Sequence, residues 1–435
     1  MDSVWTKTAD LPRFKSLDKD IKTDVLIIGG GMAGVLCASM LAQAGADYVL
    51  VEADRIGSGI TKNTTAKITL QHGLIYDKLI GQFGLEKARL YYKANEEALI
   101  KYSQICKNID CNFETKDAFV YSLNDKNKIL KEINAYQMLG VQAEFVKDLP
   151  LPLSVAGAVK LQNQAQFHPL KFLSAIAAKL NIYENTTVRQ LSEHQATTDH
   201  GTITANKIIV CTHFPFINKH GSYFIKMYQE RSYTIALENA PQINGIYVDE
   251  YPKGMSFRNE KDLLLLCGGD HRTGKQGGGW QELESFAKKH YPDAKVKYRW
   301  ATQDCMTLDE TPYIGNYSKN TPDFYVATGF NKWGMTTSMV SAMILSDLVL
   351  SKQNKYAPVF SPSRTILRPQ LFANAWEATV SMLTPTTKRC PHLGCALKWN
   401  PQEHSWDCPC HGSRFTQNGK LIDNPATGNL KKAPK

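Results

Sequence analysis

Residues 23–34, TDVLIIGGGMAG, set the architecture of the first 350 residues of the chain. The β-branched and apolar residues 23–28 predict a short buried strand, and the apolar run 35–44 predicts a helix. Three glycines lie between them with the spacing G-x-G-x-x-G, namely Gly29, Gly31 and Gly34. The first glycine permits a tight bend, the second lets the backbone approach a pyrophosphate, and the third lets helix and strand pack closely. The pattern therefore predicts a dinucleotide site.

Later segments extend this pattern into an α/β domain. Residues 48–51 predict a second strand that ends at Glu52, where a carboxylate can accept a hydrogen bond from the adenosine ribose. Residues 207–212 and 323–329 predict two more buried strands, and the second of these is followed by a helix from about 334 to 350. Strands that alternate with helices in this way are typical of a Rossmann-like parallel sheet.

Four motifs resemble the FAD-dependent D-amino-acid and glycine oxidase family of flavoenzymes: IIGGGMAG (27–34), KIIVCTHFP (207–215), DETPYIG (309–315) and ATGFNKWGMT (327–336). The resemblance covers roughly residues 20–350 and implies that the dinucleotide is FAD. Besides the three glycines and Glu52, it implies FAD contacts at Met32, Ala33, Ala53, Val188, Thr212, Gly329, Lys332, Trp333, Gly334, Met335 and Thr336.

A second region alternates polar and apolar residues, as antiparallel strands do. The segments that show this alternation are 223–238, 245–248, 254–258 and 263–268. In the resembled family such a sheet covers the flavin and forms the substrate domain. We therefore expect an α/β fold in which an antiparallel-sheet substrate domain is inserted into the FAD-binding domain.

Residues 390–413, CPHLGCALKWNPQEHSWDCPCHGS, hold four of the ten cysteines and three of the eleven histidines. Cys390 and His392 form C-x-H, and Cys408 and His411 form C-x-x-H. Two loops that each present a thiolate and an imidazole can supply a [2Fe–2S] centre of the Rieske type, in which two histidines ligate one iron. Zinc also accepts two sulfurs and two nitrogens, but zinc modules usually keep their two cysteines together.

The motifs C-P-H-L-G-C and C-P-C-H-G-S resemble the loops of the disulfide-containing branch of the Rieske family, which occurs in cytochrome bc complexes. The resemblance implies that Cys390, His392, Cys408 and His411 are the cluster ligands and that Cys395 pairs with Cys410. Few residues separate the preceding linker from Cys390. We therefore expect a module shortened to its cluster-binding β part, which would have to pack against the FAD domain for its stability.

These observations divide the chain into three parts: a flavoenzyme part, a linker and a Rieske module. The flavoenzyme part combines FAD-binding segments with substrate-domain segments. We expect the flavoenzyme part at 1–350, with FAD-binding segments at about 20–80, 155–215 and 300–350 and substrate-domain segments at about 81–154 and 216–299. A stretch rich in Ser, Pro and Lys predicts a linker at 351–372, and the Rieske module follows at 373–435.

The composition limits where the protein works. Of the residues, 43% are hydrophobic and 21% are charged, which is typical of a globular protein with a sizeable core. The N-terminal residues show no secretory signal, and the apolar run 25–46 is interrupted by the glycine turn, so we expect a cytoplasmic protein without a membrane span.

The C-terminal part is rich in basic residues: from Lys388 onward there are eight basic side chains and three acidic ones. This surplus favours an acidic, ferredoxin-like redox partner over nucleic acid.

The combination of cofactors suggests a function. A flavin accepts a hydride, whereas an iron–sulfur cluster accepts one electron at a time. We expect an FAD-dependent dehydrogenase that oxidises a C–N bond and passes electrons singly to an external acceptor. A reductase that is fed through the cluster, and a redox sensor without catalysis, remain alternatives.

Two side chains are candidates for work at the substrate. In amino-acid-oxidising relatives, the segment before T-x-D-x-x-P-x-I-G often carries an arginine for the substrate carboxylate, but our alignment places Asp304 there. An acid at this place would attract a cationic amine, although it could also be a loop-capping residue. The indole of Trp333 would line the flavin site or pack in the core.

The residues after the second cluster loop predict the redox potential. In high-potential Rieske relatives, a serine and a tyrosine at the positions of Ser413 and Phe415 donate hydrogen bonds to cluster sulfur atoms. Such bonds stabilise the reduced cluster and raise its potential. Phe415 has no hydroxyl, so we expect a lowered potential unless another donor takes its place.

Overall fold

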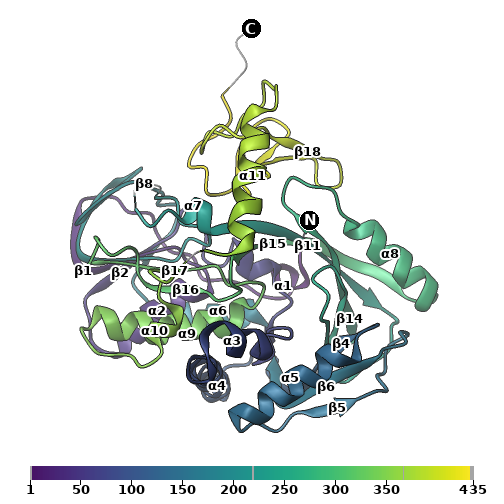
Figure 1. Ribbon diagram of the computed structural model, residues 1–435. Helices are drawn as coiled ribbons and strands as arrows, with labels where there is room; N and C mark the ends of the chain where they lie inside the picture. Colours follow the sequence, from purple (N-terminus) through teal and green to yellow (C-terminus); the bar gives the residue numbers. More distant parts are fainter. Residues whose placement is uncertain (1, 218–219, 366, 432–435) are drawn as a thin grey trace.

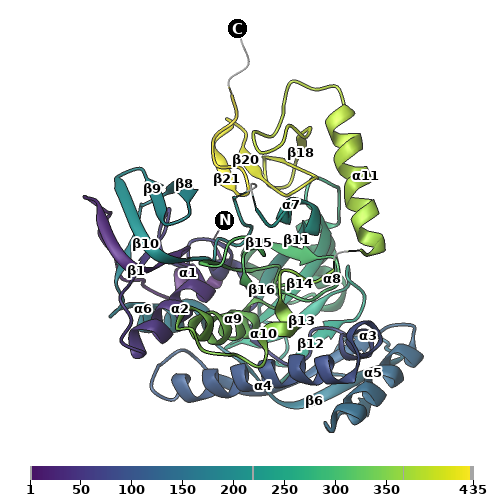
Figure 2. The same cartoon turned by 60° about the vertical axis from the view of Figure 1, so that its left-hand side comes forward.

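The computed structural model describes residues 2–217, 220–365 and 367–431, and it consists of two large β-sheets flanked by helices with a small C-terminal module above them (Figure 1). The first sheet carries the glycine turn, and the second carries the strands of the substrate domain. Figure 2 shows that the C-terminal module lies over the region where the two large sheets meet. None of the helices in the described ranges has both the length and the apolar character that crossing a membrane requires.

The first sheet has eight strands, and its main path runs β16-β17-β10-β1-β2-β7. Its strands are β1 (Ile21–Ile28), β2 (Tyr48–Val51), β7 (Ile182–Tyr183), β8 (Val188–Ser192), β9 (Gln195–Thr198), β10 (Gly201–Val210), β16 (Tyr313–Asn316) and β17 (Phe324–Thr328). The central strand β1 pairs in parallel with β2 and β10. Its last four residues are buried, as expected for a parallel strand that is covered on both faces.

Helices cover this sheet and help to set the position of the glycine turn. The helices of this part are α1 (Val4–Lys7), α2 (Met32–Gln43), the 3₁₀-helix η1 (Ile60–Asn63), α6 (Pro169–Ala177), α9 (Gly334–Val349) and α10 (Ala357–Phe360). The two apolar helices α2 and α9 pack against each other, and most of their residues are buried. Both begin at the cavity that is described below, so the same packing places two helix N-termini at that site.

The second sheet has nine strands, and its main path runs β15-β11-β14-β13-β12-β4-β6-β3. Its strands are β3 (Lys67–Ile68), β4 (Glu114–Ser122), β5 (Glu144–Val146), β6 (Gly157–Gln166), β11 (Met227–Glu238), β12 (Ile246–Asp249), β13 (Ser256–Glu260), β14 (Leu263–Arg272) and β15 (Lys295–Thr307). The helices beside it are α3 (Tyr76–Phe83), α4 (Leu85–Cys106), α5 (Lys126–Leu139), α7 (Tyr223–Lys226) and α8 (Gly279–His290).

The C-terminal module consists of one helix and a four-stranded antiparallel sheet. Its elements are α11 (Pro369–Leu383), β18 (Lys398–Asn400), β19 (Ser405–Asp407), β20 (Arg414–Thr416) and β21 (Leu421–Asp423). Its small core contains the cysteines of both cluster loops together with Leu397, Phe415 and Ala426. In Figure 1 the module, coloured yellow, lies next to α7 and the ends of β11 and β15.

The expected fold class is confirmed, and three details differ. Residues 223–226 form helix α7 and not the start of the strand. The segments 67–68, 157–166 and 300–307, which lie in the expected FAD-binding segments, pair in the nine-stranded sheet, because local patterns do not reveal which sheet a strand joins. The expected linker contains α10 and the start of α11. Proline is favoured in the first turn of a helix, and both helices carry one there.

Candidate functional site

A cavity of about 970 Å³ lies between the two large sheets and reaches beneath the C-terminal module. Its walls come from the glycine turn, from β11, β14 and β15, and from residues 421–427 of the module. Ligand cavities in proteins commonly measure about 300–1,000 Å³. This cavity therefore has room for an extended ligand.

The glycine turn presents bare backbone to this cavity. Gly29 has a φ of +112°, and a Cβ atom there would lie 2.6 Å from the carbonyl oxygen of Cys211. A Cβ atom at Gly34 would lie 1.9 Å from the carbonyl oxygen of Gly29, so only glycine lets α2 pack this closely on β1. Gly31 and Met32 line the cavity at the N-terminus of α2. Backbone N–H groups at a helix N-terminus suit a pyrophosphate, so the turn fits FAD.

Glu52 holds the turn from the neighbouring strand. Its Oε2 accepts a hydrogen bond from the backbone N–H of Gly30 at 2.6 Å, and its Oε1 accepts one from Asp54 N–H at 3.0 Å. Burial raises the pKa of this carboxyl group. The backbone N–H of Thr186 donates to the carbonyl oxygen of Glu52, which places the segment 186–189 beside the same part of the cavity.

The structure brings most of the predicted FAD contacts together. The predicted residues that line the cavity are Gly29, Gly31, Met32, Ala33, Glu52, Ala53, Val188, Thr212, Gly329, Lys332, Trp333, Gly334 and Met335. Gly34 lies behind the turn, where it packs α2 on β1, and Thr336 is buried against His72. Neither of these two belongs to the cavity wall.

Trp333 lines the cavity at the start of α9 and stacks on His72. The two ring centroids are 5.1 Å apart and the ring planes differ by 15°. His72 Nδ1 forms a hydrogen bond with the hydroxyl of Tyr91 at 2.6 Å, and its Nε2 lies 2.9 Å from Thr336 Oγ1. Burial lowers the pKa of His72 to about 3, so the ring is neutral. No motif surrounds His72, so the sequence alone does not reveal its place at this site.

Three carboxylates form what we call the acid wall: Glu230 on β11, Asp270 on β14 and Asp304 on β15. Lys332 Nζ lies 2.6 Å from Asp270 Oδ2 and 2.9 Å from Glu230 Oε2. Asp304 lies directly opposite Glu230 in the pairing of β15 with β11. Burial raises the pKa of Asp304 to about 6. Glu230 and Asp270 therefore share Lys332, whereas Asp304 forms no ion pair within the described ranges.

Lys67 on β3 also lines the cavity, although no sequence motif marks it. Its ammonium group donates to Ser256 Oγ at 2.9 Å and to Thr65 Oγ1 at 3.0 Å. Burial lowers the pKa of Lys67 to about 8, against a smaller opposite effect of Cys267. A lysine with this pKa can exchange a proton near neutral pH.

The two cluster loops have the same backbone design. The carbonyl oxygen of Cys390 accepts a hydrogen bond from Gly394 N–H at 2.9 Å, and that of Cys408 accepts one from Gly412 N–H at 2.9 Å. Both glycines have positive φ, +79° and +84°. Cys395 and Cys410 form a disulfide that joins the loops. The loops thus place the cysteine of one beside the cysteine of the other.

The four expected ligands converge on one place. The Cys390 and Cys408 thiols are within hydrogen-bonding range of each other, and the ring centroids of His392 and His411 are 5.0 Å apart. Burial lowers the pKa of His411 to about 3, so this ring is neutral. Its Nδ1 is buried and has no hydrogen-bond partner within the described ranges. A buried ring nitrogen without a partner, in a residue whose backbone N–H donates to the Cys408 thiol, fits a [2Fe–2S] centre.

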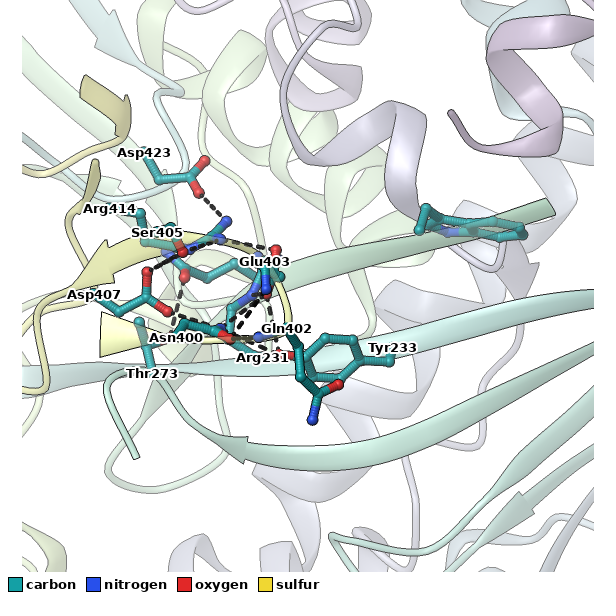
Figure 3. Close-up of polar contacts among 12 residues, drawn as sticks. Arg231, Tyr233, Thr273, Asn400, Gln402, Glu403, Ser405, Asp407, Arg414 and Asp423 are labelled. Atoms are coloured by element: carbon teal, nitrogen blue, oxygen red, sulfur yellow. Dashed lines mark hydrogen bonds and ion pairs between the residues drawn. The ribbon is translucent and has the colours of Figure 1, made fainter. Parts of the chain in front are cut away.

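A buried ion network joins the module to the second sheet (Figure 3). Arg231 on β11 and Arg414 on β20 both bind the carboxylate of Glu403, with a shortest distance of 2.8 Å for Arg414. Arg414 also binds Asp407 at 3.0 Å and Asp423 at 3.1 Å. The two arginines lower the pKa of Glu403 to about 2 against the effect of burial.

Two glutamines hold the second cluster loop against the FAD domain. Gln229 Nε2 donates to the carbonyl oxygen of His411 at 2.6 Å, and Gln303 Nε2 donates to that of Gly412 at 2.8 Å. Gln229 and Glu230 are neighbours on β11, as Gln303 and Asp304 are on β15. The same two strands therefore touch the cluster loop and carry two members of the acid wall.

Known proteins resemble both the FAD-binding part and the C-terminal module of this chain. Residues 24–348 match the family described as FAD dependent oxidoreductase, and residues 376–434 match the Rieske [2Fe-2S] domain. A putative Rieske 2Fe-2S iron-sulfur protein, YhfW of Bacillus subtilis, is 36% identical over an alignment that covers 99% of this chain and 97% of the relative. The gamma-glutamylputrescine oxidoreductase of Escherichia coli is 24% identical over 79% of this chain and 87% of its own.

The solved structures support the fold of the first part. Glycine oxidase from Geobacillus kaustophilus superposes with a TM-score of 0.68 at 18% identity, covering 79% of this chain and 99% of its own. L-proline dehydrogenase from P. horikoshii gives a TM-score of 0.67 at 17% identity, with 80% and 98% covered. The chain thus belongs to the FAD dependent oxidoreductase family and carries a Rieske [2Fe-2S] domain at its C-terminal end, so it binds FAD and a [2Fe–2S] cluster.

Proposed function

We propose that this protein oxidises a C–N bond of a cationic amine or amino acid and passes the electrons through the Rieske domain to an external acceptor. FAD supplies a two-electron hydride acceptor and the [2Fe–2S] centre supplies a one-electron relay. The acid wall carries the proposal, since it is part of the same cavity as the segments expected to contact FAD. Glycine oxidase, L-proline dehydrogenase and gamma-glutamylputrescine oxidoreductase, by their names, also act on C–N compounds.

The acid wall would bind the positive charge of the substrate. Lys332 is held by Glu230 and Asp270, so Asp304 is the carboxylate left to face an incoming ammonium group. Opposite charges attract more strongly in a cavity of low dielectric constant than in water. Because the pKa of Asp304 is raised to about 6, the carboxylate is mostly ionised at neutral pH and available for this role.

Lys67 would remove the proton that blocks the reaction. An ammonium group has no lone pair to stabilise the carbon that loses hydride, so the substrate must first become a neutral amine. Lys67 has a pKa of about 8 and interacts with Asp270 and Asp304, which places it on the side of the cavity where the amine would bind. In its neutral form Lys67 can accept this proton.

Residues at the start of α9 would stabilise the negative charge of the reduced cofactor. Gly334 and Met335 line the cavity at the N-terminus of this helix, where backbone N–H groups are available. A helix N-terminus carries a partial positive charge and favours a nearby anion. Trp333, fixed by its stacking on His72, would form the adjoining wall.

The acceptor would dock beside the first cluster loop. Helix α11 bonds to this loop through Ser381 and Ala396, and its outer face exposes Phe372, Trp376 and Leu383 by 72%, 70% and 76%. Together with the basic surplus of the module, these side chains suit a transient complex with an acidic electron carrier in the cytoplasm.

An anaerobic screen tests this function. Amines and amino acids are added to the holoprotein without oxygen, and the visible absorbance of FAD and the cluster is followed. We expect a cationic amine to bleach the flavin first and the cluster afterwards. Failure with every amine combined with reduction by a ferredoxin would favour a reductase, and no response to either would favour a sensor.

A further inference from the structure

The C-terminal module contributes to the cavity in which FAD is expected to bind. Residues 421–424, 426 and 427 line this cavity, although they belong to the Rieske module and lie far from the glycine turn in sequence. We call residues 421–427 the cover loop. No motif for FAD binding includes such a segment, so its place in the wall needs an explanation.

Asn424, in the middle of the cover loop, bonds the loop to the segment that follows β10 of the eight-stranded sheet. Its Nδ2 donates to the carbonyl oxygen of Thr212 at 2.7 Å and to that of Phe214 at 2.8 Å. Both acceptors follow the carboxyl end of β10, and Thr212 itself lines the cavity. In parallel α/β sheets the nucleotide binds at the carboxyl ends of the strands. The cover loop therefore lies over the edge of the sheet where FAD is expected.

Arg189 bonds to the C-terminal end of the cover loop. Its Nη1 donates to the carbonyl oxygen of Thr427 at 3.2 Å, while its Nε and Nη2 bind Asp199. Arg189 belongs to the segment 186–189, which lines the cavity and is hydrogen-bonded to the backbone of Glu52. The cover loop thus bonds to two parts of the cavity wall. One is the segment that follows β10, and the other is the segment 186–189 beside Glu52, the expected ribose partner.

The cover loop also touches the cluster loop. The backbone N–H of Ala426 donates to Ser413 Oγ at 3.0 Å, and the Ser413 hydroxyl forms a hydrogen bond with the thiol of Cys390. One short segment therefore lines the cavity and is also linked, through Ser413, to the cluster ligand Cys390.

We propose that the cover loop is part of the FAD site, with Asn424 as a positioning residue, so that FAD binding and docking of the Rieske module strengthen each other. Such coupling is reciprocal: if the docked module favours FAD, then bound FAD favours the docked module by the same factor. The proposal depends only on FAD binding, and it holds whether or not an amine is the substrate.

Affinity for FAD gives the first test. Asn424→Ala removes two hydrogen bonds, and we expect the dissociation constant of FAD to rise about tenfold, which corresponds to about 1.4 kcal/mol. Asn424→Asp, which cannot donate to the two carbonyls, should be at least as severe. Asn418→Ala makes the same change at an exposed place in the module outside the cavity wall and serves as the control. Equal FAD affinity in the Asn424 and Asn418 variants, with full iron content, would overturn the proposal.

Hydrogen exchange gives a second test that needs no variant. The holoprotein is compared with the same protein after release of FAD by a chaotropic salt and confirmation of its iron content. We expect bound FAD to slow amide exchange in residues 421–427 severalfold and to leave the turn at 416–420 unchanged. Exchange in the cover loop that does not respond to FAD would show that the loop merely stands near the cavity.

Discussion

The glycine turn and the acid wall face the same cavity but are built in different ways. The turn is formed by residues 29–34, and the carboxylate of Glu52 binds its backbone. The close approach of this backbone to its neighbours requires glycine at 29 and 34. The acid wall takes one carboxylate from each of three strands, which become neighbours only when β11 pairs with β14 and β15. Local sites of the first kind can be predicted from spacing, whereas sites of the second kind appear only with the fold.

The largest effect should come from Gly34→Ala in the turn. Its Cβ atom would lie 1.9 Å from the carbonyl oxygen of Gly29, a distance that forces α2 away from β1. We expect the purified variant to contain no FAD while the Rieske domain still holds iron, as measured by visible absorbance and metal analysis. Gly81→Ala, at a helical glycine where a Cβ atom meets nothing within 4 Å, is the matched control. A Gly34 variant that retains FAD would remove the steric argument for this turn.

The next effect concerns the contact between the two parts. Glu403→Gln leaves Arg231 and Arg414 without their shared carboxylate, and breaking a buried ion pair costs about 3–5 kcal/mol. We expect a clearly lower thermal unfolding midpoint for this variant, while Glu193→Gln at an exposed turn should leave it unchanged. Equal midpoints would mean that the network contributes no net stability.

The same network predicts a pH dependence. The folded pKa of Glu403 is lowered to about 2, below the value of about 4.3 that is normal for glutamate. A lowered pKa contributes stability above the unfolded value, and this contribution is lost as the pH falls from about 4 toward 2. In this window the wild type should lose stability more steeply than Glu403→Gln. Parallel curves of unfolding midpoint against pH would contradict the assignment.

Features that depend on one local segment can be predicted from the sequence, whereas features that depend on contacts between distant segments cannot. The strands at 48–51 and 324–328, the helix at 334–349 and the pairing of Cys395 with Cys410 were all anticipated, because each rests on a local pattern or a family motif. Lys67, His72 and the contacts of Asn424 were not, since these residues carry no local motif. Their contacts with Ser256, Thr336 and Thr212, respectively, each join positions more than a hundred residues apart. Asp304 was found from an alignment, but its partners were not.

A smaller effect is expected at the acid wall, and it depends on the proposed amine substrate. Asp304→Asn should raise KM for the best cationic amine about tenfold at pH 8, because a neutral amide attracts the ammonium group less than a carboxylate does. The difference should shrink as the pH falls below about 6, where the wild-type carboxyl takes up a proton. Steady-state kinetics from pH 5 to pH 8 measure this, with Asp293→Asn at an exposed turn as the control. An unchanged KM at pH 8 would exclude Asp304 from substrate binding.

The smallest effect should appear in the potential of the cluster. Phe415 is completely buried in the core of the Rieske module together with Cys390 and Cys408, and its ring cannot donate a hydrogen bond to sulfur. Ser413, by contrast, has a hydroxyl group that bonds to the Cys390 thiol. Hydrogen bonds to sulfur favour the reduced, more negative cluster, and of these two positions only 413 supplies a hydroxyl donor.

Phe415→Tyr should therefore raise the midpoint potential and Ser413→Ala should lower it. One bond of roughly 1 kcal/mol corresponds to several tens of millivolts, since about 59 mV is a tenfold change for a one-electron couple. Protein-film voltammetry measures both shifts, and the spectrum of the oxidised cluster shows whether the ligand set is intact. If the tyrosine variant keeps its spectrum and its potential does not rise, then the new hydroxyl does not reach sulfur, and packing in this core determines the potential more than the number of donors does.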